Sequence, residues 1–108
     1  MEYLEAMKKA KAALEALDGV DVRLRGEPLP ETKEQPLILL DGLSSTPYGY
    51  DQTERIQLQV SVYATDQATV AATVKSTKTP LKRAGFVQGQ TRTAPGEETG
   101  QITDWRIG

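Results

Sequence analysis

The chain has 108 residues, 38% hydrophobic and 26% charged, which suits one folded domain, residues 1–108, and is too short for two separate cores. It holds 13 basic and 15 acidic residues, too balanced for a strong grip on phosphate backbones, and it has neither cysteine nor histidine. The absence of these two residue types excludes disulfides, thiolate chemistry, cysteine zinc sites and histidine-based triads. The longest apolar run is only Leu37-Ile38-Leu39-Leu40, and the chain begins without a signal-peptide pattern. We therefore expect a cytoplasmic protein with no membrane segment.

The N-terminal segment predicts a helix followed directly by a strand. Between Tyr3 and Leu17 apolar residues recur at steps of three and four, as they do in an amphipathic helix. This stripe consists of Leu4, Met7, Ala10, Leu14 and Leu17. Asp18-Gly19 offers a residue tolerant of positive φ where the helix should stop. From Val20 to Leu24 apolar and charged residues then alternate, which indicates a short, half-buried strand.

Two loops are predicted around a short strand. Residues 26–36 contain three prolines among charged residues, which predicts a surface loop. Residues 37–40 are apolar on both faces, which is typical of a central strand, and Asp41-Gly42 is expected to end it. Leu43 to Gln52 mixes Ser, Thr, Pro and Gly with apolar residues, and we expect a second long loop there.

The second half of the chain predicts a strand, a helix and two more strands. Ile56, Leu58, Val60 and Val62 alternate with more polar residues, the strongest strand signal in the sequence. Asp66 is a candidate N-cap for a second helix, and Pro80 should stop or kink that helix. Strands are then expected from Gly85-Phe86-Val87 and over Gln101 to Ile107, with a turn between Pro95 and Gly100.

This order of elements predicts an α+β fold. Successive strands with short connections favour a mainly antiparallel sheet of four to five strands, with two helices packed on one face. We expect the stripe of the first helix to pack on the sheet face that carries Val60 and Val62.

No catalytic, cofactor or metal site is predicted. Adjacent carboxylates in a turn diverge into water, and scattered acids lack the spacing of a calcium loop. A Ser/Thr run that matches neither GxSxG nor GxxxxGK is no nucleophile elbow or phosphate loop. The groups concerned are Glu97-Glu98, then Asp41 with Asp51 and Glu54, and finally Ser44-Ser45-Thr46. Lys82-Arg83 at the end of the second helix fits the helix dipole without a ligand.

The second loop carries the residues that we predict to be an interface: Leu43, Tyr48 and Tyr50. Tyrosine on a loop offers large contact area at low rotamer cost, as recognition surfaces often do. We expect the loop from Gly42 to Thr53 to be mobile in the isolated subunit and to become ordered on assembly. The alternative is that both tyrosines fold back on their own sheet.

The element order resembles that of the tail terminator, or tail completion, proteins of long-tailed bacteriophages. The resemblance rests on the N-terminal helix, the Pro-rich loop before a short apolar strand, the alternating strand that closes on Val60-Ser61-Val62-Tyr63-Ala64-Thr65-Asp66, the following helix, Ala84-Gly85-Phe86, and the final stretch from Glu98-Thr99-Gly100 to Asp104-Trp105-Arg106-Ile107. It covers nearly the whole chain. The Thr-rich second helix with Pro80 departs from the pattern.

The resemblance implies a structural virion protein without catalytic residues. Such proteins form rings, typically hexamers, that cap the head-proximal end of the tail tube, end its polymerisation and help to join it to the head. The expected partners are further copies of the chain, the tail tube protein and a head-closure or connector protein, with DNA passing through the ring unbound. A head-closure or other neck adaptor, a small α+β ligand-binding or regulatory domain, and a hydrolase with a carboxylate pair remain alternatives.

Overall fold

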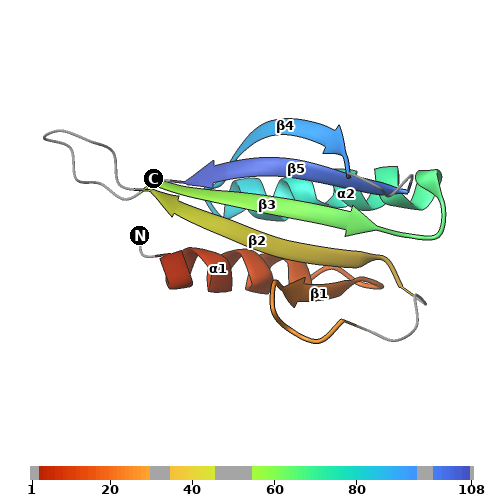
Figure 1. Cartoon of the computed structure of the whole chain (residues 1–108), viewed down its shortest axis with the longest axis horizontal. Coiled ribbons are helices and arrows are strands. Elements are labelled where there is room, and N and C mark those ends of the chain that lie inside the picture. Colours follow the sequence, from red (N-terminus) through yellow and green to blue (C-terminus); the bar gives the residue numbers. More distant parts are fainter. Residues whose placement is uncertain (1–2, 30–34, 46–54, 95–98, 108) are drawn as a thin grey trace, which may run out of the picture.

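Two helices and five strands follow one another as the sequence predicts (Figure 1). The computed structural model describes residues 3–29, 35–45, 55–94 and 99–107. Its elements are α1 (Tyr3–Glu15), β1 (Asp21–Leu24), β2 (Leu37–Ser45), β3 (Arg55–Tyr63), α2 (Gln67–Arg83), β4 (Val87–Thr93) and β5 (Gly100–Ile107). The α+β class is confirmed.

The strands form one mixed sheet in the order β1-β2-β3-β5-β4. Three of its pairings are antiparallel, and β1 runs parallel to β2. The connection over residues 25–36 makes this possible, because a parallel pairing needs a long crossover to bring the chain back to the same end of the sheet. The sheet is therefore mostly antiparallel, as predicted, with one parallel edge.

Both helices cover the same face of the sheet. α1 packs against β1, β2 and β3, and α2 packs against β3, β4 and β5. The alternation in β3 is confirmed, since its four apolar side chains all point into this layer, each with 1% of its surface exposed or less. The core residues with the largest fully buried side chains include Trp105, Leu14, Ile38, Leu40, Ile56, Leu58, Leu81, Val60 and Val62.

The buried stripe of α1 differs from the predicted one at Leu4. Ala6, Met7, Ala10 and Leu14 are buried, whereas Leu4 keeps 66% of its surface exposed. At about 100° per residue Leu4 lies about 120° around the helix axis from Ala10, off the centre of the stripe. The helix ends at Glu15, and Leu17 packs on the core from beyond it. Gly19 has the predicted positive φ, +74°.

β2 is longer than the sequence suggests. Asp41-Gly42 does not end the strand, which continues to Ser45. The reason is β3, whose backbone pairs with β2 residue by residue from Tyr63 to Arg55. This ladder overrides the local turn preference, so the prediction of a loop starting at Leu43 was wrong for residues 43–45.

α2 begins where it was predicted to begin and passes through Pro80 to Arg83. The Asp66 carboxylate accepts a hydrogen bond from the Thr69 backbone N–H at 2.8 Å, which confirms the N-cap. The expected stop at Pro80 does not occur, because fully buried Leu81 anchors the last turn to the core. Among the described residues, neither helix has the length and apolarity needed to cross a membrane.

Candidate functional site

The predicted interface residues lie in or beside the connection from β2 to β3. Leu43 belongs to β2, where its backbone lies opposite Gln57, and not to a loop. Tyr48 and Tyr50 lie outside the described residues, as does most of the segment predicted to be mobile. The interface prediction for these tyrosines therefore stays a prediction.

The sheet has a second face that is covered by neither helix of the described part of the chain. In Figure 1 α2 lies behind β3 and β5, and no element lies in front of the strands. Side chains alternate along a strand, so the residues between the buried ones point to this uncovered face. At the end of this face where β2 begins and β3 ends lies a group that we call the apolar centre, which consists of Leu37, Leu39, Ser61, Tyr63 and Ile102.

The register places these five side chains next to one another. Leu37 lies opposite Tyr63, and Leu39 lies opposite Ser61, which in turn lies opposite Ile102. Ser61 is only 8% exposed although no element covers it, since its larger neighbours shield it. Leu37, Leu39, Tyr63 and Ile102 are half-buried.

The Tyr63 ring lies against the backbone of Gly100. A Cβ atom on Gly100 would come within 2.8 Å of two carbons of this ring and within 2.9 Å of the Ala94 side chain. Glycine is therefore needed at this position so that the ring can rest on the neighbouring strand. The contact fixes the aromatic side chain at one end of the apolar centre.

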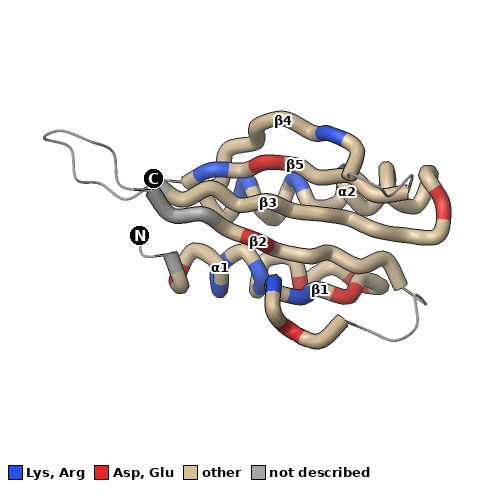
Figure 2. The backbone as a smooth tube through the Cα atoms, in the orientation of Figure 1, with Lys and Arg blue, Asp and Glu red and all other residues tan. Residues whose placement is uncertain are grey.

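Charged residues flank the apolar centre in pairs of opposite sign. On β1 the Arg23 Nε lies 2.8 Å from Asp21 Oδ1, and on the other side Arg92 Nη1 lies 2.6 Å from Asp104 Oδ2. The hydrogen bond to Asp21 raises the pKa of Arg23 above its ordinary value. Figure 2 shows one acidic residue in β2 and one in β5, which the sequence identifies as Asp41 and Asp104. Both lie in the register row next to the apolar centre, and Asp41 forms an ion pair with Arg25.

The edges of the sheet are less open to a partner than its face. At the β1 edge Glu27 occupies the backbone hydrogen-bonding groups of Leu24. The Glu27 carboxylate accepts a hydrogen bond from the Leu24 N–H at 2.7 Å, and the Glu27 backbone N–H donates to the Leu24 carbonyl at 3.0 Å. Lys11 holds the same carboxylate at 3.2 Å, and both contacts, the backbone one first, lower the pKa of Glu27. β4 carries a bulge and a charged Arg92, both of which oppose pairing with another strand.

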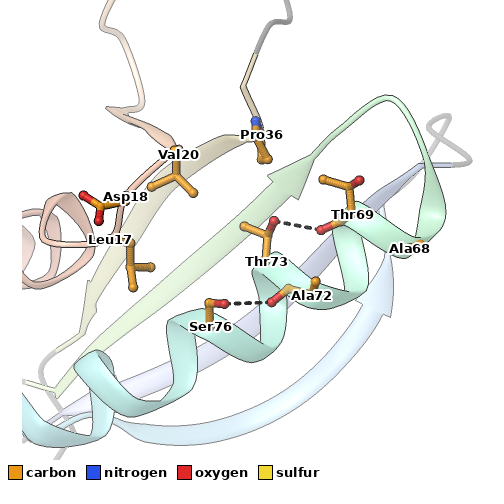
Figure 3. A pocket seen from close by; sticks show the side chains of 10 residues that line it. Leu17, Asp18, Val20, Pro36, Ala68, Thr69, Ala72, Thr73 and Ser76 are labelled. Carbon is orange, nitrogen blue, oxygen red and sulfur yellow. Dashed lines mark hydrogen bonds between the residues drawn. The ribbon is translucent and has the colours of Figure 1, made fainter.

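A groove of about 420 Å³ separates the α1–β1 connection from α2 (Figure 3). The hydroxyls along it are used by the helix itself: Thr73 donates to the Thr69 carbonyl at 2.7 Å and Ser76 to the Ala72 carbonyl at 2.9 Å. Among the described residues that line it, Asp18 alone is charged. The groove therefore offers no set of converging polar groups that would orient a substrate.

No other described group of residues offers catalytic or metal-binding chemistry. In the described ranges no three Asp, Glu, His or Cys side chains gather as metal ligands would. Asp51, Glu54 and Glu97-Glu98 lie outside them, and Ser44-Ser45 belongs to β2. Trp105 Nε1 is a buried side-chain nitrogen without a partner among the described residues, but its side chain is 1% exposed and lies in the core.

Leu37, Leu39 and Ile102 were not predicted as interface residues, although the sequence held a signal for two of them. Residues 37–40 are apolar on both faces of the strand, and two helices on one side of a sheet cover only one of these faces. Ile102 gave no such signal. No protein-family model matches this chain, and no curated protein matches it in sequence.

Proposed function

We propose that this chain is a structural virion protein of the tail terminator type. It forms a ring, hexameric in the family that it resembles, at the head-proximal end of a phage tail tube, ends the polymerisation of the tube and helps to join the tail to the head. The observation that carries this proposal is the uncovered sheet face, with an apolar centre between charged rims, in a chain whose described residues offer no catalytic arrangement. An apolar core with a polar rim is typical of surfaces that bind other proteins.

The order of the elements supports the same proposal. The resemblance rests on four elements that the structure contains: the N-terminal helix, the strand that ends on Tyr63, the helix after Asp66 and the closing strand through Trp105. The departure that we noted, Pro80 in the second helix, leaves that helix intact as far as Arg83.

The charge of the subunit is compatible with a channel for DNA. The net charge is -2, because 15 acidic residues outnumber 13 basic ones. DNA binding depends on basic groups that neutralise phosphates, so a ring of such subunits should hold DNA weakly. The expected partners, which the resemblance implies, are further copies of the chain, the tail tube protein and a head-closure or connector protein.

The test combines the purified chain with growing tail tubes and follows both by electron microscopy and light scattering. We expect rings at one end of each tube and tubes that stop lengthening once the chain is added. A chain that leaves tube growth unchanged and remains unassembled beside the tubes would refute the proposal. Binding to heads but not to tubes would instead identify a neck adaptor.

A further inference from the structure

We infer that one flank of α2 is a binding surface for an acidic segment of another protein. This surface consists of Lys75, Lys78 and Lys82, which we call the lysine ridge. The ridge belongs to the helix layer, whereas the proposed function rests on the uncovered face at the other side of the sheet. The inference therefore goes beyond the proposed function and is tested separately from it.

The first argument is the separation of charge along the chain. From Gln67 to Ala94 the sequence holds five basic residues and no acidic one. The other 80 residues hold all 15 acidic residues and only eight of the 13 basic ones. Because α2 packs against β4, which belongs to the same stretch, the basic charge also stays together in the fold (Figure 2).

The second argument is the arrangement of the three lysines on the helix. At about 100° per residue they lie within about 60° of one another around the helix axis, and at about 1.5 Å per residue they span about 10 Å along it. Lys75 and Lys82 are exposed, and Lys78 is half-buried. None of the three is among the described residues that line the groove toward α1, so the ridge occupies a different flank of α2.

The third argument is that the lysine ridge has no acidic partner within the described part of the chain. The ion pairs there involve four bases, none of which belongs to α2: Lys11, Arg23, Arg25 and Arg92. On α1 the acidic Glu5 lies one turn from Lys8 and Lys9, whereas α2 contains no Asp or Glu at all. The positive charge of the ridge is therefore left for a partner of opposite charge, which it would attract and orient.

Neither the helix dipole nor solubility accounts for the lysine ridge. The dipole favours bases within the last turn of a helix, which here holds Lys82 and Arg83. Lys75 and Lys78 come before that turn, as the ninth and twelfth of the 17 residues of α2. The net charge of the chain is negative, so each of these lysines reduces the charge that keeps the protein in solution.

An acidic protein segment fits the ridge better than DNA does. The strength of DNA binding depends on the number of phosphates that basic groups neutralise, and three lysines neutralise few. The rest of the chain has 15 acidic and eight basic residues, which repel a long polyanion. A short segment with two or three carboxylates avoids this repulsion, and carboxylates three or four residues apart on a partner helix match the spacing of the lysines.

The experiment measures binding of the full chain to fluorescently labelled poly-L-glutamate by anisotropy, at low and at high ionic strength. We expect binding that weakens as salt screens the charges. Lys75→Glu/Lys78→Glu should weaken it by about tenfold or more, because like charges then face the probe. The matched control is Lys8→Glu/Lys9→Glu, which changes the net charge equally on exposed residues of α1 and should keep the affinity within about threefold.

Lys75→Gln/Lys78→Gln removes the charge without reversing it and should give an intermediate loss of affinity, and thermal melts establish that all variants are folded. An unaltered chain that does not bind the probe, equal losses in the two Glu double variants, or tighter binding of a short DNA duplex than of poly-L-glutamate would each overturn the inference. The tube-capping assay reads the proposed function independently, so a chain that caps tubes without binding the probe refutes only the lysine ridge.

Discussion

Leu14 shows how much of this small core depends on one side chain. It is fully buried between α1 and the sheet, in the cluster that also contains Val60 and Val62. We expect Leu14→Ala to lower the free energy of unfolding by about 2 to 5 kcal/mol, because it removes contacts and leaves a cavity. Urea denaturation measures this loss. Leu4→Ala, on the exposed side of the same helix, should change stability by less than about 0.5 kcal/mol, and equal effects at both positions would contradict the packing described.

The Asp66 carboxylate caps the N-terminus of α2, and we expect its contribution to stability to depend on pH. The Thr69 backbone N–H, and then the Thr69 hydroxyl, lower the pKa of Asp66 below its ordinary value of 3.8. Because the pKa is lower in the folded state, the stabilisation is present above the unfolded pKa and is lost as the pH falls through the folded pKa. Asp66→Ala should therefore lower the melting temperature at pH 7 more than at pH 3.

Asp66→Asn is the control for this prediction. An asparagine side chain can still accept the hydrogen bond of the cap, but it does not titrate in this range. Its melting temperature should stay closer to that of the unaltered chain at pH 7 and should fall less on acidification. A pH profile for Asp66→Ala that runs parallel to that of the unaltered chain would show that the cap contributes nothing to the acid sensitivity.

Between elements, the contact of β3 with β5 depends on the absence of a side chain at Gly100. In Gly100→Ala the new methyl group would meet the Tyr63 ring at 2.8 Å and the Ala94 side chain at 2.9 Å. We expect a loss of about 1 to 3 kcal/mol in the free energy of unfolding, as overpacking typically causes. Adding Tyr63→Ala should recover part of this loss, and fully additive effects in the double-mutant cycle would contradict the contact.

Features with a clear local signal in the sequence, such as alternating apolar residues, could be predicted. Features that depend on pairing with a distant strand could not. The alternation over Ile56 to Val62 and the N-cap at Asp66 are local signals, and both were confirmed. The end of β2 was predicted wrongly. Asp41-Gly42 favours a turn by itself, but the backbone of β3 pairs with β2 before and after these two residues and keeps them in the strand. Leu4 was misplaced because several alanines, each with little apolar surface, define the centre of the buried stripe.

The candidate site was less accessible to sequence reasoning than the fold. We predicted Leu43, Tyr48 and Tyr50 as interface residues because they are large residues in a segment that contains Gly and Ser. Leu43 belongs to a strand instead of a loop. The apolar centre depends on register, which brings Leu39 beside Ser61 and Ile102 from three strands. A single sequence does not specify strand order, so Ile102 could not be linked to the β2 leucines before the sheet was known.

For the whole molecule, one layer of helices on one face of a sheet leaves much of a 108-residue chain in contact with water. Domains of this size bury only about two thirds of the surface of the unfolded chain. Association is therefore the most direct way to gain stability. The candidate regions for it are the apolar centre on the sheet face and, as a prediction from the sequence, the connection between β2 and β3. Variants can test the two regions independently.

The double variant Tyr48→Ser/Tyr50→Ser tests the region between β2 and β3. If these tyrosines contact a neighbouring subunit or the tube, their loss should weaken ring formation and lower the yield of complete particles, while the melting temperature of the isolated chain stays within a few degrees of the original. Leu39→Lys tests the apolar centre in the same assays and should likewise weaken ring formation or tube capping, because a charge then lies in the surface on which the proposed function rests. A large fall in the melting temperature of the double variant would mean that the tyrosines pack on their own sheet, and the region would then have no part in recognition.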